Sequence, residues 1–290
     1  MSFNALPGTA RLAHHSVREF LTQRLDNTSE FYTPTGPSHR TIAESCLSYL
    51  LLDDFASGPL YPADFTRALR SYPLLRYAAT NWPFHVLMAS KSSSTSFSKS
   101  SNAGTTERET ERQTERELLP LILRLMAPHQ GNGYGNNNKT QNQRFLFWLQ
   151  IVLSDSRHGY IAPDADLARA TPLYYAASYG LVETVRALVN SIGSVNNSIN
   201  SSVNSSVSSS GANAAADLNA RAGRYGGTAM HAAVWRQRPE ILKILLDAGA
   251  DPGVRDDNDM TAPELALWTK KSGMTALFPD GVRVEAKWSS

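Results

Sequence analysis

The sequence has a single cysteine, Cys46, among its 290 residues. One cysteine cannot close a disulfide within the chain, which excludes the small scaffolds that depend on disulfides for stability. The first fifteen residues also lack the basic start and apolar core of a signal peptide. We therefore expect a cytoplasmic protein, with the nucleus as the alternative compartment.

An excess of charge of one sign is missing as well. The chain has 28 Lys plus Arg against 26 Asp plus Glu, a formal net charge of +2, so the basic face typical of nucleic-acid-binding proteins is not indicated. Long apolar runs are absent too. The longest, at 118–126 and 145–153, are far shorter than the roughly 20 residues that span a bilayer, and we expect neither a nucleic-acid nor a membrane partner.

Three stretches have too little apolar surface to build a core. Residues 90–117 are rich in Ser and then in a four-residue repeat of Thr, Glu and Arg, residues 131–143 are rich in Gly and Asn, and residues 190–216 are rich in Asn and Ser. On a helix the charged repeat places like charges four residues apart and opposite charges three apart. The repulsion and the attraction roughly cancel, so the charges do not stabilise a helix. We predict a disordered linker at 90–117 and disordered insertions in the other two ranges.

Helical periodicity runs through the N-terminal residues. Ser16 and Glu19 have the spacing of a capping box that opens a helix, and the residues just before them could form one short strand. Apolar positions predict further helices at about 39–53, around Phe65, and after Pro73.

A repeated motif dominates the C-terminal part of the chain. Thr-Ala-Met-His-Ala-Ala begins at Thr228, Thr-Ala-Pro-Glu-Leu-Ala begins at Thr261, and a third copy, Thr-Pro-Leu-Tyr-Tyr-Ala-Ala, begins at Thr171. Ankyrin repeats have a period of about 33 residues, and the step from Thr228 to Thr261 equals it. The step from Thr171 to Thr228 is longer than one period, and the Asn/Ser-rich insertion between them explains the excess.

The positions of the motif have physical reasons. The Thr hydroxyl can cap the inner helix of each repeat, and Gly180 can take the left-handed conformation that ends it, although Gln237 stands at the equivalent place in the second copy. The third copy has only a vestigial outer helix, so we assign it as a cap. Because one repeat cannot bury its own apolar faces, we expect the apolar helix at 144–153 to pack against the first copy.

The strings ARLAHHSVREFLTQRL, SHRTIAESCLSYLL and PLLRYAATNWPFHV precede these repeats in this order. They resemble the region that follows the nucleotide-binding domain in fungal NACHT-ankyrin proteins, which are STAND-type, NLR-like receptors. The resemblance covers residues 8–89 and 165–280, and it implies a helical, winged-helix-like segment and a role in fungal non-self recognition. The sequence has no G-x-x-x-x-G-K-[ST] phosphate loop, so the NTPase activity of the family does not carry over.

The sequence shows no catalytic or metal-binding constellation. Adjacent His14 and His15 would point to opposite faces of a strand, and no Cys/His/Asp cluster accompanies them. His231 stands where ankyrin repeats use His to bond the turn backbone, and Cys46 lies on an apolar helix face, where a thiol is inert. A G-x-S-x-G nucleophile motif is also missing. We predict no enzyme, and no catalytic, cofactor or metal residues.

One pattern does suggest binding. Trp235 and Trp268 each follow the motif Thr by seven residues, a slot on the solvent side of the inner helix. Trp, Tyr and Arg are enriched at interface hot spots, so we predict a concave protein-binding strip, unless the insertion at 190–216 or the N-terminal segment covers it. The predicted members are Ser178, Tyr179, Arg224, Tyr225, Trp235, Arg236, Asp257, Asn258 and Trp268.

These observations predict an all-α fold. It has a winged-helix-like helical segment at 1–89, a linker at 90–117, a helical cap interrupted by a Gly/Asn-rich loop at 118–160, ankyrin repeats at 161–280 and a tail at 281–290. The predicted function is a non-enzymatic adaptor or scaffold that binds a protein partner. The alternative is a truncated regulatory remnant of a STAND receptor that docks on a separate NACHT-bearing chain.

Overall fold

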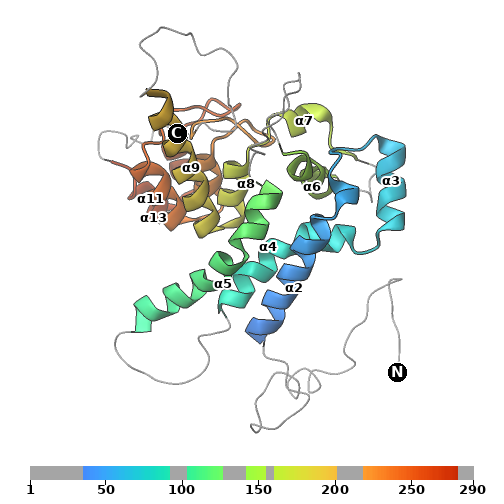
Figure 1. Ribbon diagram of the computed structural model, residues 1–290. Helices are drawn as coiled ribbons and strands as arrows, with labels where there is room; N and C mark the ends of the chain where they lie inside the picture. Colours follow the sequence, from blue (N-terminus) through green and yellow to red (C-terminus); the bar gives the residue numbers. More distant parts are fainter. Residues whose placement is uncertain (1–34, 92–102, 127–141, 155–159, 201–217, 280–290) are drawn as a thin grey trace, which may run out of the picture.

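A computed structural model describes residues 35–91, 103–126, 142–154, 160–200 and 218–279 of the chain (Figure 1). Every regular element in these ranges is a helix, which confirms the predicted all-α class. The β features there are isolated bridges that close two turns, Ala222 with Gly227 and Arg255 with Thr261. The helix predicted at Ser16, and the strand before it, lie outside the described residues.

The N-terminal half is built on two long helices. These are α2 (Thr35–Leu50) and α4 (Leu75–Lys91), which pack along each other. Between them in sequence come the short η1 (Asp53–Phe55) and α3 (Pro62–Ser71), whose first turn accommodates Pro62. Fully buried residues such as Leu47 and Trp82 form the contact between the long helices.

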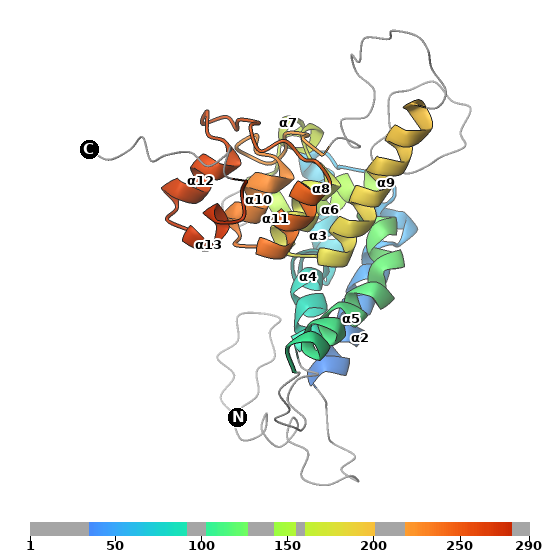
Figure 2. The same ribbon diagram turned by 90° about the vertical axis from the view of Figure 1, so that its left-hand side faces the viewer.

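The C-terminal half is a stack of helix pairs. They are α8 (Pro172–Tyr179) with α9 (Val182–Asn200), α10 (Ala229–Trp235) with α11 (Pro239–Asp247), and α12 (Ala262–Trp268) with α13 (Ser272–Thr275), preceded by α7 (Asp164–Ala168). Figure 2 shows the inner helices α8, α10 and α12 side by side.

The inner helices begin as the motif predicts. Thr171 accepts a hydrogen bond from the Tyr174 N–H, and Thr261 forms a capping box with Glu264. Gly180 ends α8 with a φ of 85°, in the left-handed region.

Two helices join these halves, α5 (Ala103–Met126) and α6 (Gln143–Leu153). Trp148 on α6 is completely buried, with its ring centroid 5.9 Å from that of Trp82 and 6.2 Å from that of Tyr175. Its indole Nε1–H donates to the carbonyl of Ala79 at 2.8 Å. Pro83 follows Ala79 by four residues within α4 and has no N–H to offer that carbonyl. Trp148 therefore supplies the hydrogen bond that the proline removes from α4, and the two halves share one core.

The structure differs from the linker predicted at 90–117, because α5 already begins at Ala103. Repetition every four residues places its arginines on one face of the helix, and Arg112 and Arg116 both reach Glu183 of α9. Glu115, only 4% exposed, accepts hydrogen bonds from the backbone N–H and the hydroxyl of Thr184, each at 2.8 Å. Contacts with Glu183 and Thr184 of α9 thus stabilise α5, although the charges of α5 stabilise that helix little by pairing with one another.

The insertions predicted at 131–143 and 190–216 are also shorter than expected. Asn142 is buried and caps α6 by accepting from the Arg144 N–H. The outer helix α9 continues to Asn200, and Ile192 extends its apolar face and is buried in the core. Residues 131–141 and 201–216 lie outside the described residues.

We predict that Trp148→Phe lowers the free energy of unfolding by about 1–3 kcal/mol, since the buried Ala79 carbonyl loses its donor. In a Pro83→Ala background a helical N–H can replace that donor, so the same change should cost less. Urea denaturation of the four proteins of this double-mutant cycle measures the difference. Equal costs in both backgrounds would show that the indole does not compensate for the proline.

Glu115 predicts a dependence of stability on pH that is opposite to the usual one for a carboxyl group. Burial raises the pKa of this carboxyl above its usual 4.5, so the contribution of Glu115 to stability is full below pH 4.5 and is lost as pH rises through the folded-state pKa. Glu115→Gln keeps an acceptor for Thr184 without the buried charge, and we expect it to be at least as stable as wild type at pH 7. Glu115→Ala should be less stable, by roughly 1–3 kcal/mol. Thermal unfolding from pH 4 to 8 tests both, and a destabilised Gln variant at pH 7 would contradict the prediction.

Candidate functional site

Two exposed tryptophans end successive inner helices. Trp235 is the last residue of α10 and is 52% exposed, and Trp268 is the last residue of α12 and is 61% exposed. We call these residues the tryptophan pair. They lie in equivalent slots of adjacent repeats, as the sequence predicts, and neither is covered by the described residues.

The turns that precede α10 and α12 stack on one another. The Asp257 N–H donates to the carbonyl of Tyr225 at 2.8 Å, which joins the tip of one turn to the next. The Asp257 carboxylate also pairs with Arg169 and Arg221, and the hydrogen bond from Arg169 is the largest cause that lowers its pKa. Asp257, which the sequence analysis predicts as a binding residue, therefore has a structural role in joining the stacked turns.

The remaining predicted residues divide into two groups. Ser178 and Tyr179 are half-buried, and the Tyr179 ring lies 5.9 Å from that of Trp148, so burial raises its pKa. The other predicted members stay exposed, and Tyr225 is 61% exposed. These exposed members are Arg224, Tyr225, Arg236 and Asn258.

His231 has the structural role that the sequence suggests. Its Nδ1 accepts from the Thr228 N–H at 3.1 Å, and its Nε2 lies 3.0 Å from the carbonyl of Met260 in the next turn. Burial lowers the pKa of this imidazole, so the neutral form is favoured. It links one repeat to the next rather than facing a ligand.

Sequence reasoning missed two basic residues beside the predicted strip. Lys271 places its Nζ 5.3 Å from the centroid of the Trp235 ring, and Arg238 donates to the carbonyl of Tyr179. Both follow the motif Thr by ten residues. A basic residue in the same slot of two successive copies is a signal that could have revealed them.

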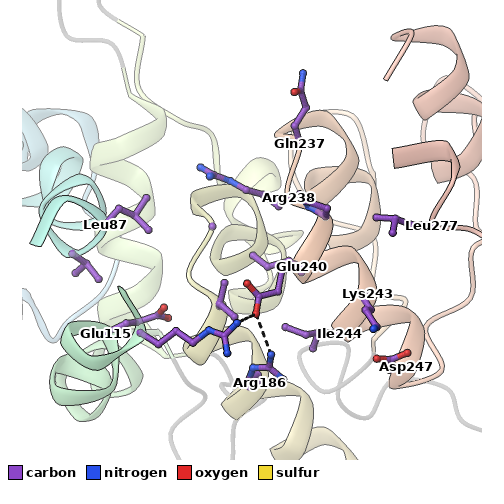
Figure 3. A pocket seen from close by; sticks show the side chains of 16 residues that line it. Leu87, Glu115, Arg186, Gln237, Arg238, Glu240, Lys243, Ile244, Asp247 and Leu277 are labelled. Atoms are coloured by element: carbon purple, nitrogen blue, oxygen red, sulfur yellow. Dashed lines mark hydrogen bonds and ion pairs between the residues drawn. The ribbon is translucent and has the colours of Figure 1, made fainter. Parts of the chain in front are cut away.

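A cavity of about 760 Å³ lies between the two halves, against the outer helices (Figure 3). Glu240 points into it and pairs with Arg112 and Arg186, and apolar side chains such as Ile244 and Leu277 also line it. Its described lining contains no His, Cys, Ser, Thr or Tyr side chain. Arg112, Arg186 and Glu240 form ion pairs across this cavity, which fits a contact between helices better than a reaction site.

A second titratable cluster joins α2 to α4. His39 Nδ1 lies 2.7 Å from His85 Nδ1, and His85 Nε2 lies 2.7 Å from the Tyr77 hydroxyl. One proton must lie between the two facing nitrogens for a hydrogen bond to form, so both rings cannot carry a proton there. Burial is the main cause that lowers the pKa of both imidazoles.

The described residues contain no group of three or more His, Cys, Asp or Glu that could hold a metal ion. Within them, no helix is both long and apolar enough to cross a membrane.

The chain is similar to known proteins in two comparisons. Residues 140–256 match the family described as "Ankyrin repeats (3 copies)". "Azaphilone pigments biosynthesis cluster protein L" from Monascus ruber is 28% identical over 250 residues, which cover 83% of this chain and 41% of that protein. The chain thus spans less than half the length of this relative.

The repeats predicted from the spacing of the motif are therefore confirmed. The match begins at residue 140 and so includes α6, which the sequence analysis assigns to a cap, and it ends before α12. The capping box at Thr261 continues the repeat geometry beyond the match. The NACHT resemblance remains a prediction.

The histidine cluster predicts a dependence of stability on pH. The lowered pKa values of His39 and His85 mean that the unfolded chain binds protons more readily, so stability is present above pH 6.5 and is lost as pH falls through the folded-state values. We expect a smaller loss between pH 7.5 and 5 for His39→Gln than for wild type, measured by urea denaturation. His231 is common to both proteins and cancels in the comparison. Identical pH profiles would exclude the pair as a source of the dependence.

Proposed function

We propose that this chain is a non-enzymatic protein-interaction module whose tryptophan pair binds a partner protein. Ankyrin repeats at 140–256 support an interaction role. The observation that carries the proposal is the exposure of Trp235 and Trp268, at 52% and 61%, in equivalent slots of adjacent repeats. Two large aromatic rings on one face are typical anchors of a protein interface.

The surroundings of the tryptophan pair favour a protein partner. Tyr225, Arg224 and Arg236 are exposed near the same stack of turns and helix ends, and these residue types are common at interfaces. The turns beneath are held by the ion pairs of Asp257 with Arg169 and Arg221 and by the hydrogen bond between His231 and the carbonyl of Met260. A rigid support lowers the entropic cost of binding, because few groups must be ordered when the partner arrives.

We further propose that the module acts in the cytoplasm of a fungus. The resemblance of residues 8–89 to the segment of NACHT-ankyrin receptors supports a role in NLR-like non-self recognition. The alternative is a regulatory remnant that docks on a separate NACHT-bearing chain. The relative from Monascus ruber, named for an azaphilone pigment cluster, supports a fungal setting and makes an adaptor in secondary metabolism a second candidate.

These settings differ in their partners. Affinity capture with the full chain from a fungal lysate, followed by mass spectrometry, should recover a NACHT-bearing protein if the chain is a receptor remnant. Recovery of biosynthetic enzymes would favour an adaptor in secondary metabolism.

The tryptophan pair provides the test of the proposed function. Partners captured by wild type should be lost with Trp235→Ala and reduced with Trp268→Ala, because each change removes an apolar anchor, with a typical cost of about 2 kcal/mol or more for a hot spot. Tyr61→Ala is the matched control, since Tyr61 is 82% exposed on the other half of the molecule. Melting temperatures must stay close to wild type, as expected for exposed positions. If Trp235→Ala retains every partner but melts early, the ring is structural and the proposal fails.

A further inference from the structure

Two inner helices each receive a basic side chain from the following repeat at their C-terminal ends. Arg238 donates to the carbonyl of Tyr179 at the end of α8, at 3.3 Å. Lys271 Nζ donates to the carbonyls of Val234, at 3.2 Å, and of Trp235 at the end of α10. The last carbonyls of a helix carry partial negative charge, which stabilises a cation there. Each cation is thereby fixed beside the aromatic residue that ends the helix.

These cations have no carboxylate partner among the described residues. Arg169, Arg221 and Arg255 pair with Asp257 or Glu264, whereas Arg236, Arg238 and Lys271 form no ion pair in the described ranges. Arg236 is close enough to lower the pKa of both Arg238 and Lys271, after burial, which is the larger cause. Three positive charges that repel one another attract an anion more strongly than isolated surface charges do.

Two of these cations lie beside Trp235 of the tryptophan pair. Lys271 reaches over the Trp235 ring with its Nζ 5.3 Å from the centroid, and Arg236 follows Trp235 directly in the chain. Arg236 is exposed, so a ligand can reach its guanidinium from solvent. An apolar side chain and a carboxylate on the same ligand could therefore be bound at adjacent points.

We propose that this surface binds an extended acidic peptide segment of the partner protein. Carboxylates of the segment bind Arg236 and Lys271, and a bulky apolar side chain between them packs on Trp235 and Trp268. This inference rests on the proposed function and specifies the chemistry of the partner. Charge complementarity selects the acidic residues, and the exposed rings favour an apolar side chain beside them.

The chain itself offers no acidic segment for this surface. Outside the described residues, 1–34 has three basic and three acidic residues, and 280–290 has two of each. None of the other ranges outside the described residues has a net charge more negative than −1. We therefore assign the complementary charge to a partner molecule.

Peptide selection on the full-length chain tests the proposal. Random twelve-residue peptides displayed on phage are selected against immobilised protein. The strongest binder is then synthesised twice, once unchanged and once with every Asp and Glu replaced by Asn and Gln. Fluorescence anisotropy measures both peptides against wild type, Arg236→Glu, Arg236→Gln and Trp235→Ala. Arg70→Glu is the matched control, because Arg70 is exposed on α3 in the other half of the molecule.

We expect selected peptides rich in Asp and Glu around an aromatic or branched apolar residue. The amide version should bind about tenfold more weakly, and Arg236→Glu should weaken the acidic peptide by about tenfold, with a smaller loss for Arg236→Gln. Arg70→Glu should bind as wild type does. The affinity should also fall when NaCl is raised from 0.1 to 0.5 M, since screening weakens exposed charge pairs.

The variants separate this inference from the proposed function. If neutral or basic peptides are selected and Trp235→Ala abolishes their binding while Arg236→Glu does not, the surface binds protein but has no preference for acids, and this inference is overturned. If Trp235→Ala changes nothing while its fold is intact, the proposed function fails as well. Equal affinity for a twelve-nucleotide single-stranded DNA would assign the cations to polyanions in general and would also overturn the inference.

Discussion

The hydrogen bond from Trp148 to the carbonyl of Ala79 connects the backbone of α4 to the side of α6. Pro83 leaves that carbonyl without its helical donor. An unpaired carbonyl in the core would lower the free energy of unfolding by about as much as one or two average point mutations do. The indole that fills this gap also packs against Tyr175 of the first repeat. The side chain that satisfies the carbonyl freed by Pro83 therefore also joins the N-terminal helices and the repeat stack in one core. A short stack with one vestigial end depends on such support, because each repeat is stabilised by its neighbours.

A second connection lies on the outer side of the stack. Glu115 of α5 binds the backbone N–H of Thr184 near the start of α9, where the helix presents unpaired N–H groups and partial positive charge. Arg112 and Arg116 pair with Glu183 beside it. With α6 against the inner helix and α5 against the outer helix, the first repeat has a neighbour on both of its helices. This arrangement leaves Trp235 and Trp268, the last residues of the other two inner helices, exposed to solvent.

The sequence predicts the parts of this fold that repeat or that alternate with a clear period. Thr228 and Thr261, one repeat period apart, indicate the ankyrin repeats, and the apolar stripe at 144–153 indicates α6. It predicts the apolar end of α5, within the helical cap at 118–160, but not the charged part before it. The charged residues stabilise α5 only through Glu183 and Thr184, which lie far away in the chain. Tertiary contacts also decide which residues of the predicted binding strip are exposed. The slot of Trp235 and Trp268 is exposed as predicted, whereas Tyr179 is drawn into the core by Trp148, a contact that no local pattern reveals.

The four tryptophans among the described residues fall into two opposite environments. Trp82 and Trp148 are completely buried and touch each other, while Trp235 and Trp268 face solvent. Indole emission shifts to longer wavelength in water, so these four described tryptophans form two sets of intrinsic fluorophores. Emission from the buried set reports whether the shared core is intact, and quenching of the exposed set by a small solute such as acrylamide reports whether the face of the repeats is free.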